Sequence, residues 1–210
     1  MQTPAFYDQV RSLNVYDPLA GFLGAAEEGL IEYRYVDAVK LAGHSCPTVA
    51  AAYWMTLKAL EHLYPDSLPQ RGGIRVEFRQ DPLSGVTGVI ANVVALLTGA
   101  THDTGFKGIG GQFDRRRLLH FSAEISGEIR YTRIDTGQAV DATAQLQSIP
   151  FAPQTAALMQ KCLDGSATAE EEAEFRACWQ ARVRMLLLEH GDDPEVFVLR
   201  VVSLFTDILK

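Results

Sequence analysis

The stretch from Pro47 to Tyr64 constrains the fold most. It is apolar on nearly every side of a helical projection and contains the run Ala-Ala-Ala-Tyr-Trp-Met at residues 50–55. A helix that is apolar all round has to be buried among other elements. Pro47 suits the first position of such a helix, because a backbone N–H would have no intrahelical partner there. We therefore expect a central buried helix over residues 47–64.

The other elements are expected to be a mixture of strands and helices. Segments with alternating apolar and polar residues, or rich in β-branched residues, predict strands at 31–35, 74–79, 118–125, 127–135 and 195–202, with Ser126-Gly127 as a turn between two of them. Helical spacing predicts short helices before residue 24, a helix ended by Gly43, a second apolar helix ended by Gly99, and helices at 153–163 and 168–190. The pattern after Asp141 is also expected to be helical. Because strands and helices do not alternate regularly, the fold class expected is α+β, with a mixed or antiparallel sheet packed by apolar helices.

Length and composition predict one folded domain. The chain has 210 residues, of which 47% are hydrophobic and 21% charged, as is usual for a globular protein. We expect a single domain over 1–210, with a core at about 30–135, a helical C-terminal part at about 153–190 and a final strand.

Charge and cysteine content limit the classes of partner. A net charge of −7 argues against nucleic acid, because phosphate binding needs a basic surface. Three widely spaced cysteines do not form a disulfide framework, and the first residues lack the pattern of a signal peptide, so we expect a cytoplasmic protein. No apolar run reaches the ~18 residues of a membrane span, so no membrane partner is expected.

Gly43-His44-Ser45-Cys46-Pro47 is the strongest chemical motif. An imidazole and a thiolate two residues apart favour zinc or a similar divalent metal, which requires three or four ligands. His102 is the candidate for a third ligand, because it lies in a loop at the end of the second apolar helix. If these helix ends meet, His44, Cys46 and His102 converge, and Asp103, His120 or water would supply a fourth ligand.

A glycine-rich loop follows His102. Four glycines within residues 105–111 let the backbone approach either a ligand or another strand closely. Lys107 is not followed by Ser or Thr, so the loop is not a Walker motif. Gly105, Lys107 and Gly108 are our candidates for contact with a small-molecule ligand or cofactor.

Each of these residues also has a structural or alternative chemical interpretation. His44 and Cys46 are suited to capping and packing at a helix start, and Cys162 and Cys178 to packing as small core residues. The arginines at 115–117 fit either a solvated strand edge or a contact with an acidic ligand. A cysteine nucleophile with His102 or His120 as base ranks below metal binding, because no local signature of a cysteine hydrolase is present.

Two motifs resemble a known family. Residues 43–47 with the helix after them, together with Leu97-Thr98-Gly99-Ala100-Thr101, are similar to the FmdE-like family, which takes its name from a component of molybdenum or tungsten formylmethanofuran dehydrogenase. The resemblance covers about residues 30–135. It implies an α+β fold, a divalent metal held by His44 and Cys46, and a homodimer.

This chain departs from the family in its second motif. Ala100 stands where the family has a cysteine, and the Cys-x-x-Cys pairs of a C-terminal zinc ribbon are absent. His102 would then replace the missing ligand. We expect a metal-binding protein, with zinc as the metal. The alternatives are a metal-dependent enzyme acting on a small pterin-like or one-carbon substrate, and a non-catalytic subunit or metal-delivery partner of a redox complex.

Overall fold

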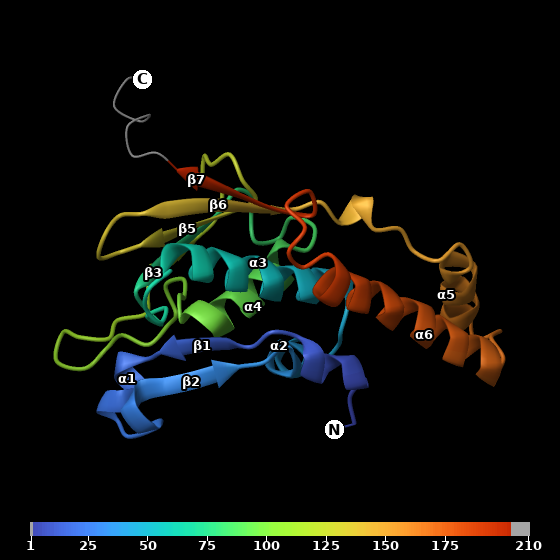
Figure 1. Cartoon of the computed structure of the whole chain (residues 1–210), viewed down its shortest axis with the longest axis horizontal. Helices are drawn as coiled ribbons and strands as arrows, with labels where there is room; N and C mark the ends of the chain where they lie inside the picture. The colour runs from blue at the N-terminus through green and yellow to red at the C-terminus, as the bar shows by residue number, and fades with distance from the viewer. Residues whose placement is uncertain (1, 203–210) are drawn as a thin grey trace.

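The computed structural model describes residues 2–202, which form three layers (Figure 1). A five-stranded sheet is the first layer. Helices α3 (Pro47–Leu63) and α4 (Thr87–Thr98) lie against one face of it and form the second. The third layer is the antiparallel pair β1 (Leu13–Tyr16) and β2 (Leu30–Tyr33) with helix α2 (Tyr35–Ala42). The α+β class expected from the sequence is confirmed.

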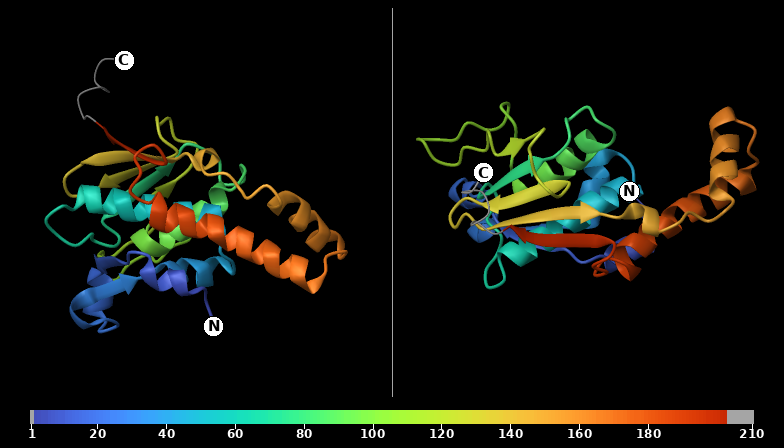
Figure 2. Two further views of the ribbon diagram at one scale, coloured as in Figure 1. Left: turned by 45° about the vertical axis from the view of Figure 1, so that its right-hand side comes forward. Right: turned by 90° about the horizontal axis from the view of Figure 1, so that it is seen from above.

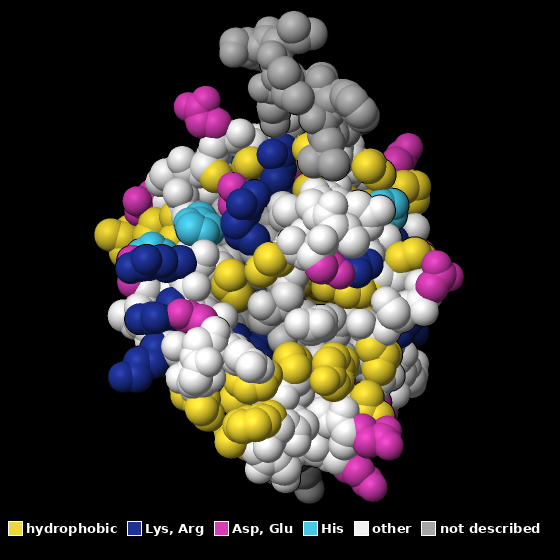
Figure 3. Space-filling model, turned by 90° about the vertical axis from the view of Figure 1, so that its left-hand side faces the viewer, with side chains coloured by type: hydrophobic (Ala, Val, Ile, Leu, Met, Phe, Trp, Pro, Cys, Tyr) yellow, Lys and Arg dark blue, Asp and Glu magenta, His cyan; other side chains and the backbone are white. Residues whose placement is uncertain are grey.

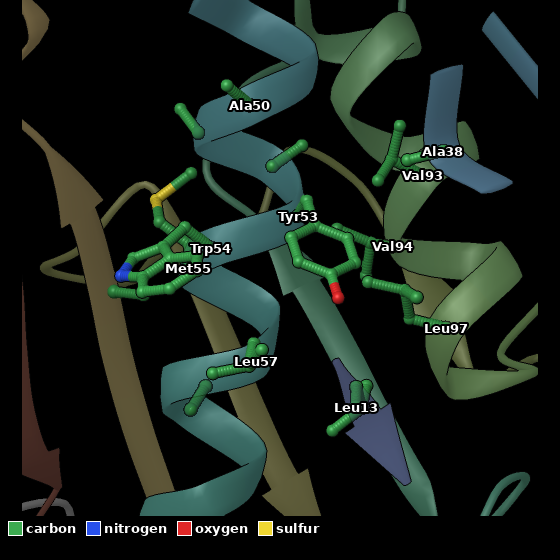
Figure 4. Packing of buried hydrophobic residues seen from close by; sticks show 14 of the residues in the cluster. Leu13, Ala38, Ala50, Tyr53, Trp54, Met55, Leu57, Val93, Val94 and Leu97 are labelled. Carbon is green, nitrogen blue, oxygen red and sulfur yellow. The ribbon is translucent and has the colours of Figure 1, made fainter. Parts of the chain in front are cut away.

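Helix α3 is apolar all round because it lies between the two outer layers. Its residues are almost all buried, and Val49, Tyr53 and Leu57 have no exposed surface. Pro47 is its first residue, and Tyr64 follows its last turn, as the sequence predicts. Figure 4 shows its side chains reaching both toward the sheet and toward α4. Fully burying one such side chain contributes about 1.5–3 kcal/mol, so this helix organises the core.

Helices α3 and α4 run in the same direction. In Figure 4, Ala50 and Leu57 follow one another down α3 as Val93 and Leu97 do down α4. Hydrogen bonds at the helix ends agree with this direction. Gly72 N donates to Thr98 O at 2.7 Å, at the end of α4. Arg133 Nη1 donates to Leu63 O at 2.9 Å, at the end of α3, and Arg133 is followed by Ile134, whose N donates to Gly73 O. Both C-terminal ends therefore lie at the start of the strand that follows residue 73.

The main sheet has the order β4-β3-β5-β6-β7. Its strands in chain order are β3 (Ile74–Phe78), β4 (Leu119–His120), β5 (Ile129–Arg133), β6 (Ala139–Ala144) and β7 (Phe197–Val202). The β3–β4 pair is parallel, and the others are antiparallel.

Two of our sequence interpretations are wrong in this sheet. The segment around Asp141 is the strand β6 and not a helix, since its place between β5 and β7 and against α3 outweighs the helical preference of its alanines. The strand expected over 118–125 is only two residues long. It pairs with β3 and not with β5, so no hairpin turns at Ser126-Gly127.

One row of ionisable residues crosses all five strands. The pairing register aligns, from β4 to β7, His120, Glu77, Arg130, Asp141 and Arg200. Side chains alternate between the faces of a strand, and the neighbours Val76, Tyr131 and Val140 point into the core. The ionisable row therefore lies on the opposite face. No helix of the described chain covers that face, as the view from above in Figure 2 shows.

The C-terminal helices form a hairpin that projects from the body in both views of Figure 2. Helix α5 (Thr155–Asp164) packs on α6 (Ala169–Arg184), which continues as a π-helical turn over Met185–Glu189. The capping box predicted at the start of α6 is present between Thr168 and Glu171. The other short helices are Ala5–Gln9, α1 (Pro18–Phe22), Glu27–Gly29 and Leu146–Ser148. None of the described helices is long and apolar enough to cross a membrane.

Candidate functional site

His44 lies on the surface in the short link between α2 and α3. Its Nδ1 is 3.0 Å from the carbonyl oxygen of Ala42. A carbonyl oxygen only accepts hydrogen bonds, so Nδ1 carries the proton, and Nε2 of the neutral ring keeps a lone pair. Metal-binding histidines are commonly oriented in this way, by a backbone carbonyl on the other ring nitrogen. In His44, Nε2 is therefore the ring nitrogen with a lone pair free to accept a proton or a ligand contact.

Cys46 is buried and is the N-cap of α3. Its backbone is extended, with φ −149° and ψ 168°, and its Sγ accepts a hydrogen bond from Val49 N at 3.4 Å. The sulfur thus satisfies one of the backbone N–H groups that a helix start leaves without an intrahelical partner. This contact fixes the side-chain rotamer of Cys46 at the helix start.

Ser45, between these two residues, is anchored by three other segments. Its Oγ lies 2.9 Å from Tyr35 Oη and donates to Gln180 Oε1 at 3.1 Å. Its carbonyl oxygen accepts from Trp179 Nε1 at 2.9 Å. Tyr7 Oη also donates to Gln180 Oε1, at 3.2 Å. The body and the α5–α6 hairpin therefore meet on the residue that separates the two candidate ligands.

The electrostatics of this network keep its hydroxyls neutral. Burial raises the pKa of Tyr35 strongly and outweighs the hydrogen bond with Ser45, which lowers that pKa. Burial also raises the pKa of Tyr7. Both phenols therefore stay protonated at neutral pH and act as hydrogen-bonding groups around Ser45.

The structure does not bring His102 to His44 and Cys46. His102 follows the C-terminal end of α4, whereas the other two residues precede the N-terminal end of α3, and these helices run in the same direction. The length of α3 alone is about 25 Å at 1.5 Å per residue. His102 is exposed, with Nδ1 3.3 Å from Asp103 Oδ2 and its ring centroid 6.0 Å from that of Phe121.

The other candidate ligands lie elsewhere too. Asp103 is beside His102, and His120 is on β4, with Nε2 2.9 Å from Arg117 O. Across residues 2–202, no group of three or more His, Cys, Asp or Glu side chains is arranged to hold a metal ion. His44 and Cys46 are therefore two neighbouring candidate ligands without a third from the described part of their own chain.

The glycines of loop 99–118 allow the loop to fold on itself. A Cβ at Gly105 would lie 1.6 Å from Thr101 Oγ1, and one at Gly108, where φ is +86°, would lie 2.2 Å from Gln112 O. Lys107 is exposed. Figure 3 views this end of the molecule, where Lys and Arg side chains gather along one edge. Contacts within the loop thus account for Gly105 and Gly108, and a ligand at Gly105, Lys107 and Gly108 stays a prediction.

Arg115 differs from both sequence interpretations of the arginine triplet. It is 5% exposed, and its Nη2 donates to Asp17 Oδ1 at 2.7 Å. Arg71 Nη1 donates to the other oxygen of the same carboxylate at 2.8 Å. This buried cluster attaches loop 99–118 to the start of α1. The sequence offered only a weak signal for it, a single acid before Pro18 that also caps α1.

Two hollows that our sequence reasoning missed lie near Arg79, one on the helix-free face of the sheet and one between the ends of β3 and β5 and the start of α4. A polar cavity of about 410 Å³ is lined by residues that include Arg79, Glu128, Asp141 and Arg200. A second cavity of about 380 Å³ shares Arg79 and Glu128 with it and is bounded by apolar residues at the start of α4. The alternation along β3 predicted that charged residues share one face, but not that strands distant in sequence would bring other charges beside them.

The chain matches no protein-family model, and a search of curated proteins also gives no match. The resemblance to the FmdE-like family therefore depends on the residues at 43–47 and 97–101 alone.

Proposed function

We propose that this protein binds a divalent metal ion, zinc by the chemistry of the donors, through His44 Nε2 and Cys46 Sγ. One observation carries the proposal. The hydrogen bond between His44 Nδ1 and Ala42 O selects the tautomer in which Nε2 is the ligand atom. Ser45, between the two donors, is held by Tyr35, Trp179 and Gln180, so both donors start from a fixed backbone.

The proposed site is open, because zinc takes three or four ligands and no group of three candidate ligands exists among the described residues. Water or an oxygen of a small-molecule ligand would take the other positions. Zinc bound in this way polarises a ligand oxygen or lowers the pKa of bound water. His102 is left out of this ligand set and becomes the natural control.

Metal analysis tests the proposal. Protein purified without a histidine tag is expected to contain about one zinc per chain, and His44→Ala and Cys46→Ala are each expected to lose most of it. His102→Ala and Cys162→Ala should keep the wild-type content. Equal metal content in all five proteins, or a loss caused by His102→Ala alone, would contradict the assignment. Circular dichroism shows whether each variant is folded.

The proposal also covers the oligomeric state, the cellular compartment and the ligand of the protein. We propose a cytoplasmic homodimer that takes a small-molecule ligand, in line with the family that residues 43–47 resemble. Sedimentation of the purified chain tests the dimer, and fractionation of cells with an antibody to the chain tests the compartment. A monomer at micromolar concentration would contradict the first, and recovery in a membrane or secreted fraction would contradict the second.

A further inference from the structure

We infer that the protein binds a small organic anion at the end of the sheet near Arg79, with a carboxylate or phosphate group held between Arg79 and Arg200 on the helix-free face. The apolar body of this ligand would extend around the strand ends toward the start of α4. This site uses neither His44 nor Cys46. It therefore stands or falls independently of the proposed metal site.

The polar cavity contains two arginines without an acidic partner. Among the described residues, neither Arg79 nor Arg200 forms an ion pair within 4.0 Å, and the hydrogen bond given for the Arg79 side chain is to Ser126 O, at 3.5 Å. Asp141 does not neutralise them. It is 3% exposed, and it accepts from Arg130 Nε at 2.7 Å and from Arg130 Nη2 at 3.1 Å. The charge of Asp141 is thus already compensated within the sheet.

The remaining acid of the cavity is Glu128. Its Oε2 accepts from Ala144 N at 3.2 Å, which ties the carboxylate to the backbone of β6. Arg79 and Arg200 therefore leave a local excess of one positive charge over Glu128, on a chain whose net charge is −7. Arginine presents a planar fork of donors that matches a carboxylate or a phosphate. An anion is the ligand class that this arrangement favours.

The second cavity gives this ligand its apolar part. It shares Arg79 and Glu128 with the polar cavity, but its wall includes Phe78, Ile90 and Ile129. Each cavity is within the ~300–1,000 Å³ range that is common for small-molecule sites, and such sites combine apolar walls with a few polar groups. A ligand with an anionic group at Arg79 and a ring or short chain toward Ile90 would use both cavities.

Calorimetric titration with phenyl phosphate, benzoate and inorganic phosphate tests the inference on the full chain. Saturable binding of phenyl phosphate or benzoate is expected, and the tighter of the two identifies the anionic group. Arg79→Ala and Arg200→Ala should each weaken that binding by about tenfold or more, because each removes a charge-assisted hydrogen bond. Glu128→Gln should strengthen it several-fold, since the amide oxygen can still accept from Ala144 N while the repulsion is gone.

Two matched controls separate a built site from general charge attraction. Arg75→Ala removes an arginine from β3 that is ion-paired with Glu77 and does not line either cavity, so binding should be unchanged. Ile90→Ala should weaken binding of phenyl phosphate but not of inorganic phosphate. Equal effects of Arg75→Ala and Arg79→Ala would overturn the inference. So would the absence of saturable binding to folded protein, or a change of oligomeric state in Arg79→Glu and Arg200→Glu that marks this face as a subunit interface.

Discussion

Arg115 and Asp17 are separated by 98 positions in sequence, yet Nη2 of the arginine lies 2.7 Å from Oδ1 of the aspartate. The other carboxylate oxygen of Asp17 accepts from Arg71, and Oδ1 also caps the N-terminus of α1. One buried carboxylate therefore joins helix α1, the segment before β3 and the loop after α4. Removing this carboxylate should therefore loosen the attachment of all three segments.

Asp17→Asn should lower the free energy of unfolding by about 3–5 kcal/mol, because it leaves two arginine side chains without their buried counter-charge. Urea unfolding followed by circular dichroism measures this. Asp114→Asn is the control, since Asp114 pairs with Arg116 at the surface, where solvent screening leaves such pairs little net effect on stability. Similar losses in the two variants would mean that the Asp17 cluster is not a buried anchor.

Stability should fall in acid through the same carboxylate. Burial alone would raise the pKa of Asp17, but hydrogen bonds from Arg71 and Ala20 N and the charge of Arg115 outweigh it, so the folded pKa is below its usual value. The stabilisation is complete above the unfolded pKa of about 3.9 and is lost as pH falls through the lower folded pKa. Below about pH 4, wild type should therefore lose stability more steeply than Asp17→Asn. Parallel curves from denaturant titrations at a series of pH values would contradict the lowered pKa.

Two helix-ending glycines should respond differently to alanine. Gly43 and Gly99 both have left-handed φ, +75° and +71°, so alanine at either costs about 1–2 kcal/mol of backbone strain. A Cβ at Gly43 meets nothing within 4 Å, whereas one at Gly99 lies 2.7 Å from Arg115 Nη1. Gly99→Ala should therefore cost about 1–3 kcal/mol more than Gly43→Ala. Thermal unfolding of both variants makes the comparison. Equal midpoints would show that the Arg115 side chain can move away from the new Cβ without loss of stability.

The two hydroxyls of a buried pair between α3 and β5 should differ in how much stability is lost when each is removed. Thr56 Oγ1 donates to Ala52 O at 2.7 Å, so it accepts from Tyr131 Oη, 3.0 Å away. Tyr131→Phe leaves Thr56 with its donor satisfied and should cost about 1 kcal/mol. Thr56→Val leaves the Tyr131 hydroxyl buried without this partner and should cost about 1–3 kcal/mol. Chemical denaturation gives both values. A larger loss for Tyr131→Phe would contradict the assignment of Tyr131 Oη as the donor to Thr56 Oγ1.

Ser45→Ala should loosen the α5–α6 hairpin and weaken metal binding together. The change removes the hydroxyl that contacts Tyr35 and Gln180, although the carbonyl that accepts from Trp179 remains. We expect a stability loss of about 1–3 kcal/mol and, following the usual effect of supporting groups, zinc affinity weaker by about tenfold. Competition with a zinc-binding dye measures the affinity. Ser166→Ala, at an exposed serine, is the control. If Ser45→Ala lowered stability but left zinc affinity unchanged, the hydrogen bonds of Ser45 would not support metal binding.

Sequence patterns predicted the elements whose partners are local. The bounds of α3 follow from Pro47 and an unbroken apolar run, and the end of α4 from Gly99. Strand β6 was missed because its residues are small and its strand character comes from β5 and β7 on either side, which are remote in sequence. Periodicity reports how one element is buried, but not which elements pair with it.

The candidate metal site shows the same limit. Sequence patterns indicated His44 and Cys46 as candidate ligands, and the hydrogen bond of His44 Nδ1 to Ala42 O is consistent with the proposed use of Nε2. The expectation for His102 required the end of α4 to meet the start of α3, and no sequence pattern gives the relative direction of two packed helices. The arginines of the proposed anion site were not found either, because Arg79 and Arg200 line one cavity only through the order of the strands.

The row of ionisable residues from His120 to Arg200 also favours one pairing register of the strands over the others. Slipping a strand by one residue would turn its charges into the core, and slipping β6 by two would place Ala139 or Thr143 opposite Arg130. Asp141 would then lose both bonds from Arg130, at a buried position where an unpaired carboxylate is costly. A wrong register of β6 is thus raised in free energy by the unpaired Asp141, although the alanines of β6 could pack almost equally well in several registers. In this sheet, charge selects the register, and apolar burial stabilises it.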